Sequence, residues 1–171
     1  LLPRSSCEGR RDHMWSMLFF GAARGGRWEG VEADWEDPQM FRAEGGKVGG
    51  YCMAVPSAAH AGRGAAITTP FTLLSGKPYT VSAWMRADVE DYPGSIALLH
   101  YLGPRHHQGM AGAYPRLTTQ WQRVSFVATP KPPVETPGED QTAAPLEAVL
   151  QVAPSATIHG TVYVDGLQIE A

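Results

Sequence analysis

Apolar and polar residues alternate most clearly in the stretch YTVSAWMR, residues 79–86. Because successive side chains of a β-strand point to opposite faces, this alternation predicts a strand with one core face and one outward face. The core face would carry Tyr79, Val81, Ala83 and Met85. The outward face is polar apart from Trp84, and an outward tryptophan is a common platform for a flat ligand. The alternative is that a loop or the N-terminal segment covers Trp84, which then only packs.

Weaker patterns of the same kind recur along the rest of the chain. The expected strands cover residues 14–20, 51–55, 65–73, 79–86, 95–102, 122–129, 146–152 and 161–170. Turn-forming Pro and Gly residues separate them, at 75–78, at 92–95 and in the Pro-rich stretch 131–145. We expect a long Gly-rich loop at 21–50 and no helix longer than a turn or two. About eight or nine half-buried strands predict an all-β fold, an antiparallel β-sandwich of the jelly-roll type.

The composition adds limits on size and partners. A chain of 171 residues suits one domain with one core. A net charge of −3 argues against a nucleic-acid or anionic-membrane partner, which would normally leave a basic face. No apolar run approaches the ~18 residues needed to cross a bilayer. We therefore expect a neutral partner, no nucleic acid and no membrane.

The first residues look like a cloning leader. LLPRSS resembles a degenerate protease-site linker, and His13-Met14 is what a common cloning junction encodes. We therefore exclude residues 1–13 and assign one module to 14–171, with MWSMLFF as its first strand. The alternative is a signal peptide in which residues 14–20 are the apolar part.

Residues that could carry chemistry are few. The acids of the Gly-rich stretch 29–37 could hold a carboxylate pair, but clustered acids in a loop are usually solvated. His106 and His107, which we place in a loop, would point opposite ways in an extended chain and could bind a metal only with partners from elsewhere. Cys52, inside the apolar run YCMAV, predicts a small buried hydrophobe. No nucleophile or phosphate-binding motif is present, so the sequence predicts no enzyme.

Three segments resemble a known family. They are ITTPFTLLSGKPYTVSAWMRAD, LTTQWQRVSFVATP and TVYVDGLQIEA. Over residues 66–171 they resemble the jelly-roll carbohydrate-binding modules of families four, nine and twenty-two, with a "pGk.Y.vS.w.ka" strand, a "t.W.r....f" strand and a closing "vyvDdvqlE" strand. The chain departs from that pattern at FFGAARGGRWEG, where the family often has an Asn-Gly-Asp-Phe-Glu-like segment. It departs again at Gly166, which replaces the family's second acid.

This resemblance implies a function. It implies a secreted or cell-surface, non-catalytic module that binds a polysaccharide in a groove on one sheet, as an appendage of a glycoside hydrolase or polysaccharide lyase. In such modules aromatic rings stack on sugars while amides and charged groups bind hydroxyls. The candidates are Trp84 as platform, Arg86, Arg123 and Gln151 beside it, His100 or Tyr101 from the adjacent strand, and Trp35 as the preferred rim aromatic among Trp28, Trp35, Tyr92 and Tyr114. Trp121 is expected to pack at the core or the edge.

The last strand suggests a metal. Asp165 followed by Gly166 predicts a β-bulge that turns the carboxylate toward a backbone or an ion. In the resembling family this Asp often helps to bind calcium, which implies a structural calcium site at Asp165. The alternative is that Asp165 accepts hydrogen bonds from backbone N–H groups.

Two other function classes stay open. The chain could be a structural or assembly domain of a phage-tail or cell-surface protein, with an exposed apolar patch and self-association. It could also be a lyase or hydrolase on the same fold, which would need convergent Tyr, His and Arg side chains or paired carboxylates.

Overall fold

The computed structural model describes residues 15–20, 30–31, 42–57, 63–68, 71–102, 106–131, 145–155 and 157–171. For 15–20, 30–31, 42, 63–68, 101–102 and 106–110 the description covers the backbone. In these ranges every regular element is a β-strand and every strand pair is antiparallel, which confirms the all-β prediction. None of the described elements is a helix that could span a bilayer.

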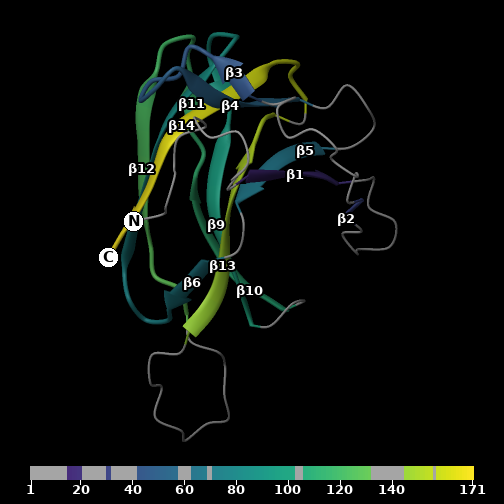
Figure 1. The fold of residues 1–171 in the computed structure, drawn as a ribbon. Helices are drawn as coiled ribbons and strands as arrows, with labels where there is room; N and C mark the ends of the chain where they lie inside the picture. Colours follow the sequence, from purple (N-terminus) through teal and green to yellow (C-terminus); the bar gives the residue numbers. More distant parts are fainter. Residues whose placement is uncertain are drawn as a thin grey trace, which may run out of the picture.

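Two sheets form the layers of the sandwich (Figure 1). The seven-stranded sheet has the order β10 (His106–Ala113), β9 (Ser95–Leu102), β13 (Pro145–Ala153), β5 (Arg63–Thr68), β1 (Trp15–Phe20) and β2 (Gly30–Val31), with β6 (Phe71–Leu74) also paired to β13. The five-stranded sheet has the order β12 (Gln122–Ala128), β7 (Tyr79–Ala87), β14 (Thr161–Glu170), β4 (Tyr51–Pro56) and β3 (Arg42–Glu44). A two-stranded sheet pairs β8 (Tyr92–Pro93) with β11 (Arg116–Leu117).

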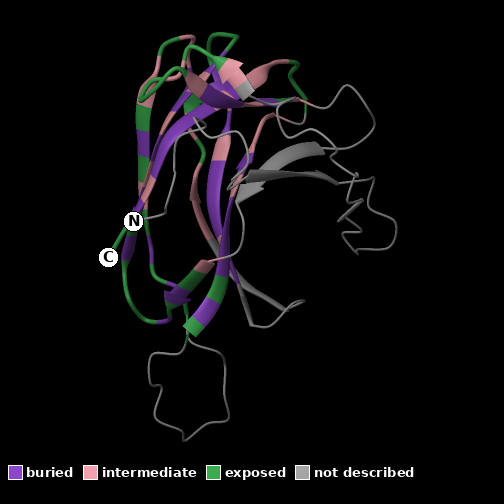
Figure 2. Ribbon diagram, in the orientation of Figure 1, coloured by how far each residue is buried: buried purple, intermediate pink, exposed green. Residues whose placement is uncertain are grey.

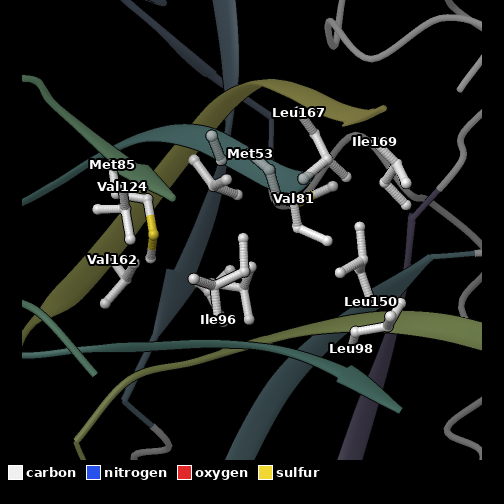
Figure 3. Close-up of a cluster of buried hydrophobic side chains, with 14 of the residues drawn as sticks. Met53, Val81, Met85, Ile96, Leu98, Val124, Leu150, Val162, Leu167 and Ile169 are labelled. Atoms are coloured by element: carbon white, nitrogen blue, oxygen red, sulfur yellow. The ribbon is translucent and has the colours of Figure 1, made fainter. Parts of the chain in front are cut away.

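One hydrophobic core lies between the two large sheets. Val81 and Met85 of β7 are 0% exposed, which confirms the predicted core face of that strand. Leu98 of β9 and Leu150 of β13, which are partners in register, pack into the same core from the other sheet (Figure 3). Burying each such leucine contributes about 1.5–3 kcal/mol, so this core fixes which face of each strand looks outward.

The outward faces follow from the same alternation. Along β12, Val124 and Ala128 are buried, while Arg123, Ser125 and Val127 are exposed (Figure 2). The outward side of the five-stranded sheet therefore holds every second residue of β12 and β7.

Some predicted elements differ from the structure. Residues 65–73, predicted as one strand, contribute to β5 and β6, which pair with different parts of β13. Pro70 lies between these two strands in the sequence and has no N–H to continue a ladder. The predicted loop at His106 and His107 is wrong, because both residues lie in β10 and pair with β9. The predicted leader, residues 1–13, lies outside the described residues.

Candidate functional site

Aromatic and cationic side chains gather on the outward side of the five-stranded sheet. We call this surface the Trp84 face: Ser82, Trp84 and Arg86 of β7, Arg123 of β12 with the preceding Trp121, Tyr163 and Gln168 of β14, and Lys47 from the β3–β4 turn. In the sheet register, Trp84 lies between Arg123 and Asp165, and Arg86 lies beside Tyr163. Residues that are distant in sequence thus converge on one surface.

Trp84 is half-buried at the centre of this face. The Lys47 Nζ lies 4.9 Å from the centroid of its ring, and the Arg123 Cζ lies 5.7 Å from it. Each such cation–π contact contributes about 0.5–1 kcal/mol at exposed sites. The ring also passes close to Gly166, where a Cβ atom would lie 3.2 Å from the Trp84 Cδ1. The β3–β4 turn therefore partly covers Trp84. The ring is neither the fully open platform nor the fully covered packing residue that the sequence left as alternatives.

Hydrogen bonds hold the Arg123 guanidinium in place. Its Nη2 donates to the Ser82 Oγ at 2.6 Å and to the Gln168 Oε1. Its Nη1 donates to the Gly166 carbonyl oxygen at 3.4 Å. Arg123 is nevertheless exposed, so its charge faces solvent in a fixed orientation.

Arg86 stacks between two aromatic rings. Its Cζ lies 4.0 Å from the Tyr163 ring centroid and 5.2 Å from that of Trp121. The expectation that Trp121 packs at the core or edge is therefore too narrow: the ring is half-buried and belongs to the Trp84 face. The signal that could have placed it is its phase, since Trp121 lies two residues before the outward Arg123.

Asp165 connects the β3–β4 turn to β14. Its Oδ2 accepts from the Val48 N–H and its Oδ1 from the Gly166 N–H, both at 2.7 Å. The register shift between Asp165 and Gln168, with Gly166 at φ +55°, confirms the predicted bulge. Because Val48 follows Lys47, this buried carboxylate also places Lys47 against Trp84.

The calcium prediction meets little support at Asp165. Both carboxylate oxygens already accept backbone hydrogen bonds, and the described residues contain no group of three His, Cys, Asp or Glu side chains that could hold a metal ion. Asp165 alone does not supply the 6–8 oxygen ligands that calcium takes. A structural calcium ion therefore stays a prediction.

Cys52 lies on the outward side of β4, next to the core residue Met53, yet it is 0% exposed. Burial raises the pKa of its thiol to about 11; the Arg86 charge opposes this rise and the Asp165 carboxylate adds to it. The prediction of a buried, hydrophobe-like thiol is confirmed.

The remaining predicted site residues lie elsewhere. Gln151 points outward from the seven-stranded sheet, because its neighbours Leu150 and Val152 belong to the core. His100 shares the inward phase of Leu98 and is 6% exposed, which places it away from an outward ligand. Tyr101 has the opposite phase to His100 in β9, but its side chain lies outside the described residues.

Of the expected rim aromatics, the structure describes Tyr92 and Tyr114. Trp28 and Trp35 lie outside the described residues. Tyr92 is 0% exposed and its hydroxyl donates to the Ile158 carbonyl oxygen at 3.0 Å, so it is no rim residue. Tyr114 is exposed. Of the predicted site residues whose side chains the structure describes, it therefore brings together Trp84, Arg86 and Arg123.

No family model and no curated protein sequence matches this chain. Several solved structures are similar. The enzymatically active domain of bacteriophage CBA120 tailspike protein 4 has a TM-score of 0.57 at 10% identity, over 98% of this chain and 21% of that one. This chain thus spans about a fifth of the tailspike structure.

A second similar structure is the family 11 carbohydrate-binding module from Clostridium thermocellum, in complex with a β-1,3-1,4-mixed-linked tetrasaccharide. It has a TM-score of 0.53 at 12% identity, over 95% of this chain and 90% of that one. The chain has the β-sandwich fold of this module. At this identity the likeness concerns the fold.

Proposed function

We propose that this chain is a non-catalytic module that binds a polysaccharide or oligosaccharide on the Trp84 face. The observation that carries the proposal is the half-buried Trp84 ring with the exposed, fixed Arg123 guanidinium beside it. The face of an aromatic ring packs against the apolar face of a sugar ring. Neighbouring donors form hydrogen bonds with the sugar hydroxyls, each of which contributes about 0.5–1.5 kcal/mol to binding. Trp121 and Tyr163 extend the aromatic surface along the sheet.

The resemblance to modules of families four, nine and twenty-two supports the wider setting. We infer that the module is secreted or lies at the cell surface, next to the catalytic domains of a glycoside hydrolase or polysaccharide lyase. The similarity to a family 11 module, over most of both chains, agrees with this setting at the level of the fold.

Affinity gel electrophoresis over a panel of soluble polysaccharides tests the proposal. The parent chain should be retarded by at least one polysaccharide, and Trp84→Ala should lose that retardation. Gln151→Ala is the matched control, because Gln151 lies on the outward side of the other sheet. If Gln151→Ala loses binding while Trp84→Ala keeps it, the ligand lies on the seven-stranded sheet and the proposed site is wrong.

A second candidate function is a structural or assembly domain of a phage-tail or cell-surface protein. The tailspike similarity over 98% of this chain favours it, and Val127, at the far end of β12, is 64% exposed. This function predicts concentration-dependent self-association in sedimentation velocity that Val127→Ser reduces. A monomer that binds glycan would exclude it.

A further inference from the structure

The Trp84 face has a positive charge that the acidic composition of the whole chain does not predict. Lys47, Arg86 and Arg123 all contact its aromatic rings, although the net charge of the chain is −3. Within the described part of the chain, no carboxylate forms an ion pair with any of these three side chains; the pair Arg116–Asp91 lies on another sheet and its adjoining turn. The charge of the face is therefore available to a ligand.

The acids nearest in the sheet register do not neutralise this charge. Asp165 is 2% exposed, so its single negative charge lies beneath the face and is smaller than the charge of the three cations together. Asp88, two residues after Arg86 in the sequence, is exposed, and its Oδ1 accepts from the Thr161 N–H at 2.7 Å. Glu170 pairs with Thr80, four residues from Trp84 along β7, which is about 13 Å at 3.3 Å per residue. A ligand at Trp84 would thus meet cations first.

The two arginines are arranged to bind an anion. A guanidinium has five N–H donors, and the hydrogen bonds of Arg123 to Ser82, Gln168 and Gly166 leave some of them for a ligand. Arg86 makes no hydrogen bond to a described residue, and stacking on Tyr163 leaves the donors at the edge of its plane accessible. Side chains held in this way lose little conformational entropy on binding. The paired N–H donors of a guanidinium match the paired oxygens of a carboxylate or a sulfate.

We infer that the ligand of the Trp84 face is an anionic glycan, whose uronate carboxylates or sulfate esters bind Arg86 and Arg123 while a sugar ring stacks on the aromatic side chains. This inference rests on the proposed function and narrows its ligand class. It replaces the neutral partner that the net charge of the chain suggested, because the local charge of the face differs in sign from the total.

Polymer pairs that differ only in charge test the inference. Polygalacturonate is compared with its fully methyl-esterified form, and a sulfated galactan with its desulfated form. In at least one pair, the charged polymer should bind at least about tenfold more tightly than its neutral counterpart. The ratio of the two affinities should fall as the salt concentration is raised. The pair that shows the preference identifies carboxylate or sulfate as the recognised group.

Variants then locate the charge that matters. Arg123→Gln and Arg86→Gln should each weaken binding of the preferred polymer on the order of tenfold, as expected for the loss of a charge-assisted contact. Lys47→Gln keeps the folded sheet intact because Lys47 is exposed in a turn, and it should also weaken binding. Arg116→Gln removes the same charge outside the Trp84 face and should change nothing.

The outcomes separate this inference from the proposed function. If neutral and charged polymers bind equally and Trp84→Ala still abolishes binding, the anionic ligand is wrong and the proposed function stands. If no polymer of either kind binds, both are wrong. Equal affinity for a single-stranded DNA oligonucleotide would show general attraction of polyanions and would also overturn the inference.

Discussion

Replacing Trp84 with alanine removes the centre of the proposed site. The structure sets the cost for folding: a tryptophan buries about 150–250 Å² when fully covered, so a half-buried ring contributes about 2.5 kcal/mol at 25 cal/mol per Å². The cation–π contacts with Lys47 and Arg123 add about 0.5–1 kcal/mol each. The free energy of unfolding should therefore fall by about 3.5–4.5 kcal/mol, which is less than the stability of about 5–15 kcal/mol that a typical domain has.

The effect on binding should be separable from this loss of stability. If Trp84 stacks on a sugar, glycan affinity measured by isothermal titration calorimetry should fall by about 2 kcal/mol or more, as at an interface hot spot. Leu98→Ala is the control, because this 1% exposed core residue should lose about 2–5 kcal/mol of stability and keep full affinity in the folded protein. Trp84→Ala with parental affinity would refute the role of Trp84 as platform.

Three further predictions concern the residues under the Trp84 face. Gly166→Ala should lower the free energy of unfolding by about 1–2 kcal/mol in chemical denaturation, since its φ is +55° and the new Cβ would crowd Val48 and then Trp84. Parental stability would contradict the described bulge. The Cys52 thiol, with its pKa raised to about 11, should resist a thiol reagent at pH 8 until the protein unfolds, and rapid labelling of the native protein would contradict its burial. Asp165→Ala should lower the free energy of unfolding by about 2 kcal/mol or more, because two backbone N–H groups lose their acceptor; an unchanged denaturation midpoint would refute this role of Asp165. In the parent chain, a melting temperature lowered by EDTA would support a structural calcium ion, and an unchanged melting temperature would exclude one.

Local pattern predicted much of the fold. The alternation in residues 79–86 gave both faces of β7, and the pair Asp165–Gly166 gave the bulge in β14. The strand β10 was missed because HHQGMAGA is rich in small residues with weak strand propensity, and its pairing with β9 decides its conformation.

The site was less predictable for a geometric reason. Phase along a strand tells which residues face outward, as it does for both Trp84 and Gln151. It does not tell which sheet a strand joins, and these two residues lie on different sheets. The positive charge of the Trp84 face was hidden for a similar reason, because Lys47, Arg86 and Arg123 come from three elements that only the sheet order brings together.

A nuclear magnetic resonance titration with an oligosaccharide of the bound polymer tests the proposed site most directly. The indole N–H signals of Trp84 and Trp121, assigned by substitution, should shift saturably, while the side-chain amide of Gln151 should stay in place. Shifts at Gln151 with unmoved Trp84 and Trp121 signals would contradict a glycan site on the Trp84 face.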